Sequence, residues 1–171
     1  MIIADATPGD VSGITAIYNH AVQHTTAIWN ETVVDAADRA AWLGAKGRAG
    51  HPVLVARDET GAVIGYATFG DWRPHDGYRH TVEHSVYARA DRQGEGIGSA
   101  LMTELIARAR RQGKHVMVAA IDAQNDPSIR LHERLGFERA GTLRQVGTKF
   151  GTWLDLTFLQ LVLDDRPAPT A

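Results

Sequence analysis

Gln-Gly-Glu-Gly-Ile-Gly-Ser, at residues 93–99, is the stretch of this sequence that says most about its fold. It follows a predicted strand at 80–88 and opens a predicted amphipathic helix whose apolar face carries Leu101, Leu105 and Ala109. Glycines at such a turn let the backbone approach a ligand closely, and the free N–H groups at a helix start attract anions. The stretch therefore predicts an anion-binding turn between a strand and a helix.

Two common phosphate-binding motifs do not match this turn. A Walker A loop requires a lysine, and none lies here; a dinucleotide fingerprint requires a third glycine where the chain has Ser99. Asp122 could mimic the acid that binds a ribose, but the 49 residues after it are too few for the further strand–helix units of a doubly wound fold. The remaining match is Gln-x-x-Gly-x-Gly, formed by Gln93, Gly96 and Gly98.

This pattern resembles the pyrophosphate-binding signature of the GNAT N-acetyltransferase superfamily, which uses acetyl-CoA. Residues 125–137, Asn-Asp-Pro-Ser-Ile-Arg-Leu-His-Glu-Arg-Leu-Gly-Phe, resemble a second GNAT segment, Asn-x-x-Ala-x-x-x-Tyr-x-x-x-Gly-Phe, with Ser128 and His132 at the alanine and tyrosine positions. The histidine is similar to that of phosphinothricin N-acetyltransferases. The segments 26–31, 70–74, 77–87 and 149–155 look more specifically like the methionine sulfoximine and methionine sulfone acetyltransferases. The resemblance extends over about residues 2–163.

The remaining sequence predicts one domain of mixed strands and helices, at residues 1–164, followed by a mobile tail at 165–171. Apolar runs predict strands at 2–6, 53–56, 63–69, 80–88, 116–121, 137–145 and 153–163, and helical spacing predicts helices ending near residues 24, 50, 113 and 135. The resemblance implies an α/β (α+β) GNAT fold, with a central mixed, mostly antiparallel sheet flanked by helices.

The composition excludes several classes of function. The chain has 171 residues, 18 Lys and Arg against 20 Asp and Glu, and no cysteine. It therefore has no disulfide, no cysteine-ligated zinc and no cysteine nucleophile. The balanced charge argues against a nucleic-acid partner, and we expect neither a membrane-spanning segment nor a signal peptide. We expect a cytoplasmic protein.

One short motif points to a different chemistry. Residues 80–84, His-Thr-Val-Glu-His, match the zinc-protease pattern His-x-x-Glu-His, which requires a helix. The β-branched residues Thr81, Val82 and Val86 favour a strand, which would separate the two histidines by roughly 13 Å. We therefore expect no metal site.

The resemblance also implies roles for individual residues. Glu83 would be the general base, and His132 would steady or protonate the CoA sulfur. The cofactor-binding residues would be Val86, Tyr87, Ala88, Gln93, Gly94, Glu95, Gly96, Ile97, Gly98, Ser99, Asn125 and Ser128. The substrate-binding residues would be Trp72, Arg73, Pro74, His75, Tyr78, Arg79, Glu83, His84 and Ser85, with an arginine binding a carboxylate.

The function implied is acetyl-CoA-dependent acetylation of the α-amine of a small glutamate-like or methionine-like amino acid, by direct attack in a ternary complex. Resemblance also implies a homodimer. Two alternatives remain open: a GNAT enzyme for another amine, such as a protein N-terminus or a polyamine, and a non-catalytic acyl-CoA-binding sensor.

Overall fold

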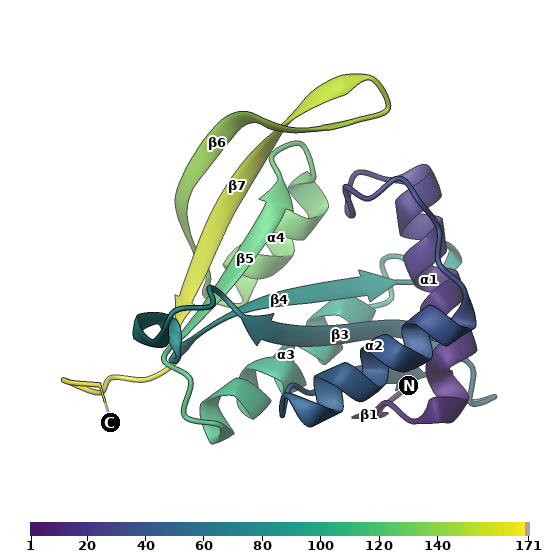
Figure 1. Cartoon of the computed structure of the whole chain (residues 1–171), viewed down its shortest axis with the longest axis horizontal. Helices are drawn as coiled ribbons and strands as arrows, with labels where there is room; N and C mark the ends of the chain where they lie inside the picture. The colour runs from purple at the N-terminus through teal and green to yellow at the C-terminus, as the bar shows by residue number, and fades with distance from the viewer. Residues whose placement is uncertain (170–171) are drawn as a thin grey trace.

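The computed structural model describes residues 1–169, which form a seven-stranded sheet and four α-helices (Figure 1). The strands are β1 (Ile2–Asp5), β2 (Val53–Arg57), β3 (Val63–Asp71), β4 (Thr81–Ala88), β5 (Val116–Asp122), β6 (Glu138–Lys149) and β7 (Thr152–Val162). The helices are α1 (Val11–His24), α2 (Ala36–Arg48), α3 (Ile97–Arg111) and α4 (Asp126–Arg134). The predicted strands and helices are confirmed, with ends that differ by a few residues.

The sheet has the strand order β1-β2-β3-β4-β5-β7-β6. The neighbouring strands run antiparallel except for β4 and β5, which are parallel. The mixed, mostly antiparallel sheet predicted for a GNAT fold is therefore confirmed.

Strands β4 and β5 separate after a short stretch of pairing. They pair from Thr81–Val116 to Glu83–Val118 and then diverge, as Figure 1 shows. A backbone N–H or C=O group that leaves a ladder needs another hydrogen-bond partner. The far half of β4 can therefore pair with a ligand.

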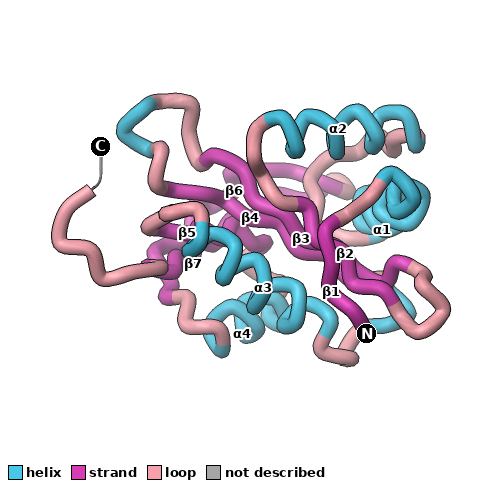
Figure 2. The backbone as a smooth tube through the Cα atoms, turned by 90° about the horizontal axis from the view of Figure 1, so that it is seen from below, coloured by secondary structure: helices cyan, strands magenta, loops and turns pink. Residues whose placement is uncertain are grey.

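The helices form two layers around the sheet. Helices α1 and α2 cover one face, and α3 and α4 cover the other (Figure 2). Along β4 the side chains alternate between the faces. Val82 belongs to the buried cluster with Leu101 and Leu105 of α3, whereas Tyr87 packs against the clusters of α1. Glu83 therefore faces the α1/α2 layer, like Tyr87.

The local sequence explains where the two helices nearest the divergence begin. The Asn125 side chain accepts a hydrogen bond of 3.2 Å from the Ser128 N–H, which caps α4, and Pro127 fits the first turn of that helix. The N-cap residue of α3 is instead Gly96, whose φ is +79° and which provides no side-chain cap. The α3 start therefore keeps its backbone N–H groups available for an anion.

Strand β4 contains the apparent zinc motif. Residues Thr81–Ala88 form a strand, as predicted, so the helix that His-x-x-Glu-His requires is not formed.

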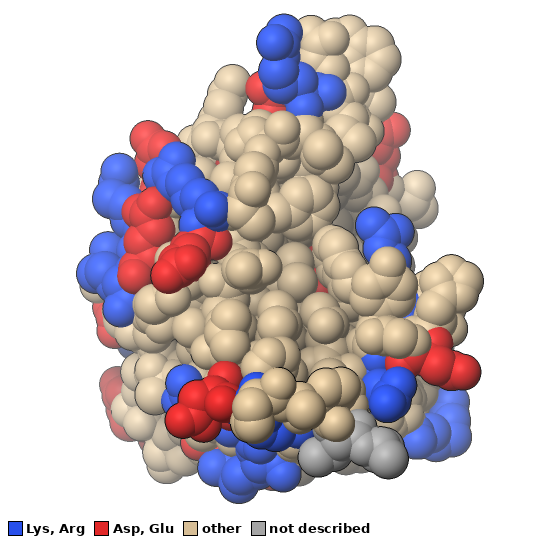
Figure 3. All heavy atoms as spheres, turned by 90° about the vertical axis from the view of Figure 1, so that its left-hand side faces the viewer, with Lys and Arg blue, Asp and Glu red and all other residues tan. Residues whose placement is uncertain are grey.

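In the part of the chain that the structure describes, no helix is both long and apolar enough to cross a membrane. On the face shown in Figure 3, basic and acidic side chains lie beside one another and do not gather by sign.

The end of the chain was predicted to be a mobile tail from residue 165. The Arg166 guanidinium donates to the Asp164 carboxylate at 3.1 Å and to the Gly113 carbonyl at 3.0 Å, so this residue is anchored beside the end of α3. The part of the prediction that concerns residues 170 and 171 lies outside the described residues. The boundary at residue 164 stays a prediction.

Candidate active site

A cavity of about 500 Å³ lies at the diverging end of β4. Its wall contains every predicted cofactor-binding residue except Glu95: Val86, Tyr87, Ala88, Gln93, Gly94, Gly96, Ile97, Gly98, Ser99, Asn125 and Ser128. The two motifs quoted above are separated by α3 and β5 in the chain, and the fold brings both to this cavity. A larger cavity of about 680 Å³ lies beside it along α1 but includes no residue of the glycine turn.

The glycine turn has the geometry of an anion cradle. Gly94 and Gly96 have φ angles of +84° and +79°, a region that favours glycine, and a Cβ at either position would meet no atom within 4 Å. A Cβ at Gly98 would lie 3.1 Å from the Leu131 side chain, so this glycine lets α3 and α4 approach closely. The open turn, the uncapped helix start and the adjoining cavity fit the diphosphate of acetyl-CoA.

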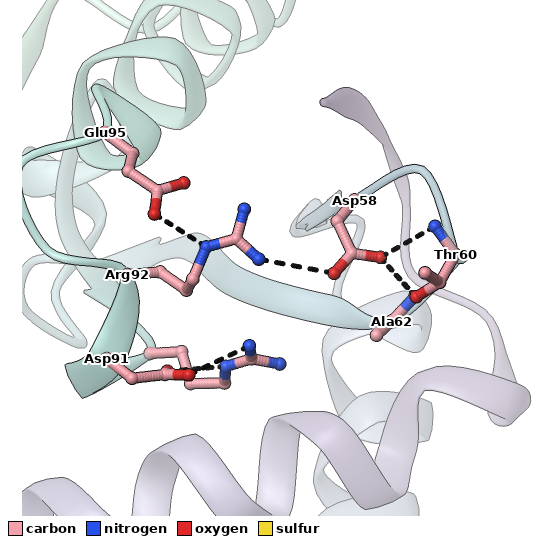
Figure 4. Close-up of polar contacts among 7 residues, drawn as sticks. Asp58, Thr60, Ala62, Asp91, Arg92 and Glu95 are labelled. Carbon is pink, nitrogen blue, oxygen red and sulfur yellow. Dashed lines mark hydrogen bonds and ion pairs between the residues drawn. The ribbon is translucent and has the colours of Figure 1, made fainter.

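An arginine anchors this turn to the β2–β3 hairpin (Figure 4). Arg92 donates to Glu95 at 2.7 Å and to Asp58 at 3.4 Å, and Asp58 also accepts hydrogen bonds from the Thr60 hydroxyl and the Ala62 N–H. The hydrogen bond from Arg92 lowers the pKa of Glu95. The Glu95 side chain is thus engaged with Arg92, and Glu95 does not line the cavity. Its predicted role as a cofactor contact is not supported by this placement.

Glu83 lies at the last point where β4 and β5 are paired. It is half-buried and faces the α1/α2 layer. Burial raises the pKa of Glu83 above its ordinary value, and the positive charge of Arg73 opposes this shift. A carboxylate with a raised pKa is a stronger base, so the arrangement suits proton abstraction from an amine.

His84 and His132 form a buried, stacked pair on the opposite face of β4. Their Nε2 atoms are 3.1 Å apart, and the His132 Nδ1 lies 2.7 Å from the Ser128 carbonyl oxygen. A carbonyl only accepts, so the neutral His132 carries its hydrogen on Nδ1, and its Nε2 accepts from the His84 Nε2–H. The His84 Nδ1 then has no partner. The pair joins β4 to α4.

This pairing changes how two predicted site residues are interpreted. His84 is only 7% exposed and faces away from Glu83, so its placement does not support the prediction that it lines the acceptor pocket. His132 is 1% exposed and both its ring nitrogens have partners. A direct role for His132 at the CoA sulfur is therefore not supported by its hydrogen bonds, and a positioning role fits them better.

We expect the histidine pair to make the protein less stable in acid. Burial lowers the pKa of His84 well below its ordinary value and also lowers that of His132. Below the unfolded pKa of about 6.5, the unfolded chain binds protons that the folded chain does not, so the free energy of unfolding falls as pH drops. The slope reaches at most about 1.4 kcal/mol per pH unit for each histidine.

Urea denaturation at several pH values between 5 and 8 measures this effect. His84→Phe is expected to reduce the slope below pH 6.5, and His75→Phe, at an exposed loop position, should leave it unchanged. Equal slopes in the wild-type protein and the His84→Phe variant would show that His84 does not stay neutral in the folded state.

The loop before β4 carries most of the predicted substrate residues. The Arg73 guanidinium stacks 4.8 Å from the centre of the Trp72 ring, and Trp72 packs edge-on against Phe158 of β7. Arg73 therefore has a defined position, and its charge acts on Glu83. The Arg79 guanidinium instead donates to the Asp76 carbonyl of its own loop at 3.0 Å.

The remaining predicted substrate residues divide between the loop and the strand. Pro74, His75 and Tyr78 are exposed, and the rings of His75 and Tyr78 lie 6.4 Å apart. Ser85 shares the α1/α2 face of β4 with Glu83 and hydrogen-bonds Tyr87, whose pKa is raised by burial. The structure thus brings Arg73, Glu83 and Ser85 to one side of the sheet and leaves the loop tip at the surface.

Sequence reasoning missed the contribution of α1 and the segment after it. The cavity beside the glycine turn is also lined by Ile17, Ala21, Thr25 and Ala27. The helical spacing of Ile17 and Ala21 signals a buried face but does not distinguish a face packed on core from one that borders a cavity. Only the position of α1 beside β4 reveals this wall.

Comparison with known proteins gives matches over the whole chain. The profile of the acetyltransferase (GNAT) family matches residues 14–137. A protein from Pseudomonas paraeruginosa, L-methionine sulfoximine/L-methionine sulfone acetyltransferase, is 61% identical over 98% of both chains. Phosphinothricin N-acetyltransferase from Alcaligenes faecalis is 39% identical, over 91% of this chain and 79% of that protein.

A solved structure is similarly close. An acetyltransferase from Salmonella typhimurium with its cofactor acetyl-CoA superposes with a TM-score of 0.96 and is 57% identical, covering 100% of this chain and 98% of the other. The fold and the acetyl-group chemistry predicted from the two motifs are confirmed by these matches.

Proposed function

The chain belongs to the acetyltransferase (GNAT) family, and we propose that it acetylates the α-amine of a small amino acid such as methionine sulfoximine, methionine sulfone or phosphinothricin. The observation that carries this proposal is the position of Glu83. This half-buried carboxylate stands where β4 and β5 separate, in electrostatic reach of Arg73 and on the strand that leads into the cofactor cavity. Modification of such toxic amino-acid analogues would give resistance to them.

Amide formation requires a neutral amine, and Glu83 is placed to accept its proton directly or through a water molecule. The α-ammonium of an amino acid is largely protonated at pH 7, because its reference pKa is about 7.7–8.0. At Val86, Tyr87 and Ala88, β4 is paired with β3 on one side but no longer with β5 on the other. This free edge would hydrogen-bond the pantetheine arm and offer an N–H group to the oxyanion. The glycine turn would hold the diphosphate.

The absence of cysteine supports direct transfer between the two substrates. An acyl-cysteine intermediate is excluded because the chain has no cysteine. The amine would therefore attack the thioester in a ternary complex. His132, joined to His84 and Ser128, would position α4 against the cofactor cavity.

Arg73 is the residue we propose for recognition of the amino-acid carboxylate. Arginine binds carboxylates through two parallel hydrogen bonds, and the stacking on Trp72 already restricts this guanidinium. Arg79 is a second candidate, although its guanidinium contacts its own loop.

We also propose that the protein is a homodimer joined through the β6–β7 hairpin. The outer part of this hairpin bends over toward the end of α1 (Figure 1), and its exposed apolar side chains include Val146, Phe150 and Trp153, the last 65% exposed. Isolated exposed apolar clusters of this kind are typical of interfaces. Light scattering should give the mass of two chains, and a Trp153→Glu variant should give the mass of one chain. A monomeric wild type would contradict the proposal.

A cytoplasmic location stays a prediction.

A panel of acceptors with acetyl-CoA tests the function. Purified protein is incubated with methionine sulfoximine, methionine sulfone, phosphinothricin, glutamate, a polyamine and a peptide N-terminus, and free CoA thiol is measured. The enzyme has no thiol of its own to raise the background. We expect release of the CoA thiol with methionine sulfoximine, methionine sulfone and phosphinothricin. Release only with the polyamine or the peptide would favour another amine, and acetyl-CoA binding without release would favour a sensor.

A further inference from the structure

Lys149, at the end of β6, is a buried cation that none of the proposed chemistry uses. Its side chain is 1% exposed, and its Nζ donates to the carbonyl oxygens of Thr25 at 2.6 Å, Ala21 at 3.4 Å and Ile28. These three acceptors are backbone groups. Burial lowers the pKa of Lys149, and the negative charge of Glu31 opposes this shift. Burying an ammonium group costs free energy unless hydrogen bonds compensate for the lost water. The three carbonyl contacts of Lys149 provide this compensation.

The three carbonyls belong to the end of α1 and the segment that follows it. The last carbonyls of a helix have no partner within the helix, and its C-terminal end carries a partial negative charge. Helix α1 ends at His24, and Thr25 is its C-cap residue. The carbonyl of Ala21, in the last turn, also accepts from the Thr25 N–H at 3.2 Å, and Lys149 adds a further donor to it. Lys149 therefore caps α1 from a hairpin more than one hundred residues further along the chain.

The same turn forms part of the cofactor cavity. Ala21, Thr25 and Ala27 all line it. The carbonyls of Ala21 and Thr25 are bonded to Lys149, so these two residues contact both the cation and the cavity. A shift of this backbone would move the cavity wall.

Two further contacts involve this segment, residues 25–35. A Cβ at Gly147 would lie 2.1 Å from the Trp29 ring, so the hairpin backbone presses directly on that ring. The Trp29 Nε1–H donates to the Thr26 carbonyl at 2.9 Å, and the Thr26 hydroxyl donates to Asp122 at the end of β5. The segment is thus held from the hairpin on one side and from the diverging strand on the other.

We propose that Lys149 is a positioning residue for acetyl-CoA binding: its ammonium group fixes the α1 end and the following segment as the wall of the cofactor cavity. The inference rests on the proposed use of this cavity for acetyl-CoA. It assigns to the β6–β7 hairpin a part in cofactor binding as well as its proposed part in the dimer.

The test compares Lys149→Met with Arg57→Met. Methionine keeps a long unbranched side chain but removes all three donors. Arg57 makes two hydrogen bonds, of 2.8 Å and 2.6 Å, to the buried Asp10 and does not line the cofactor cavity, so its loss also destabilises the fold. Calorimetry measures the Kd of acetyl-CoA below the melting transition of each variant. We expect about tenfold weaker binding for Lys149→Met, and a change of less than about twofold for Arg57→Met.

Hydrogen exchange without ligand provides a second readout. Lys149→Met should speed exchange of amides in residues 25–35 and leave the β2–β3 hairpin unchanged, and Lys149→Gln, which keeps two donors, should lie between it and the wild type. Gly147→Ala is the fallback variant if Lys149→Met does not fold. It displaces Trp29 and leaves Lys149 in place, and it should also weaken acetyl-CoA binding.

The outcomes separate this inference from the function on which it rests. If wild-type protein does not bind acetyl-CoA, the proposed use of the cavity fails. If the wild type binds and both Lys149→Met and Gly147→Ala bind equally well, Lys149 has only a structural role and the inference is wrong.

Discussion

Replacing Glu83 by glutamine is expected to lower kcat by about 10²- to 10³-fold and to change the Kd of acetyl-CoA by less than about twofold. The glutamine amide has the same shape but cannot accept a proton from the amine. Glu83 lies at the last paired position of β4 and β5, and the cavity that we assign to acetyl-CoA is lined by later residues of β4. Loss of turnover with intact cofactor binding is therefore the result that this geometry implies.

Steady-state kinetics and calorimetry on the same preparation measure both quantities. Glu59→Gln, at an exposed position in the β2–β3 turn, is the matched control and should keep wild-type kcat. An unchanged kcat in Glu83→Gln would remove Glu83 from the mechanism.

The pH profile provides an independent check on Glu83. A base must be deprotonated, so activity should fall as pH decreases through the pKa of Glu83. Burial raises this pKa, so the acidic limb of kcat/KM should lie at a higher pH than an ordinary glutamate would give. Arg73 opposes the rise, so removing the arginine should move this limb to still higher pH.

Replacing Arg73 by alanine is expected to raise KM for amino-acid acceptors by about 10- to 100-fold, with a much smaller effect on kcat. A hydrogen bond to a charged group contributes about 1.5–3 kcal/mol, so the net loss of one such bond corresponds to about this range. The effect should fall on KM because the carboxylate is bound alike before and during the reaction.

An acceptor amine that lacks a carboxylate is the internal control for this variant. Its KM should be the same with and without Arg73, and Arg79→Ala should affect the amino acids less than Arg73→Ala does, because the Arg79 guanidinium donates to the Asp76 carbonyl. Equal losses for acceptors with and without a carboxylate would contradict the recognition role.

Some features of this protein depend on neighbouring residues, and others depend on contacts between residues far apart in the chain. The glycine turn and the capped α4 were predictable because their signals are local: glycine takes φ angles near +80°, and Asn125 caps α4 through a hydrogen bond from the Ser128 N–H, three residues further along the chain. Glu95 lies within the motif, yet Arg92 turns its side chain away from the cavity, and the motif contains no sign of that contact.

The faces of β4 show the same limit more sharply. Alternation predicts that Glu83 and His84 point in opposite directions, but it does not say which layer covers either one. The stacking of His84 on His132 depends on α4 packing against that face, 48 residues further along the chain. The family resemblance implied that His84 binds the acceptor and that His132 contacts the CoA sulfur. The hydrogen bonds of the two histidines do not support these roles.

The sequence by itself determined the strands and helices of the described residues and the glycine turn that we propose to hold the diphosphate, because periodicity, caps and glycines act over a few neighbouring residues. Only the tertiary structure decided which helix forms the far wall of the cavity, which nitrogens of the histidine pair are occupied, and that Lys149 caps α1. The physical reason is that burial and hydrogen-bond pairing depend on groups distant in the chain, and a lone lysine in the sequence looks the same whether water or three carbonyls surround it.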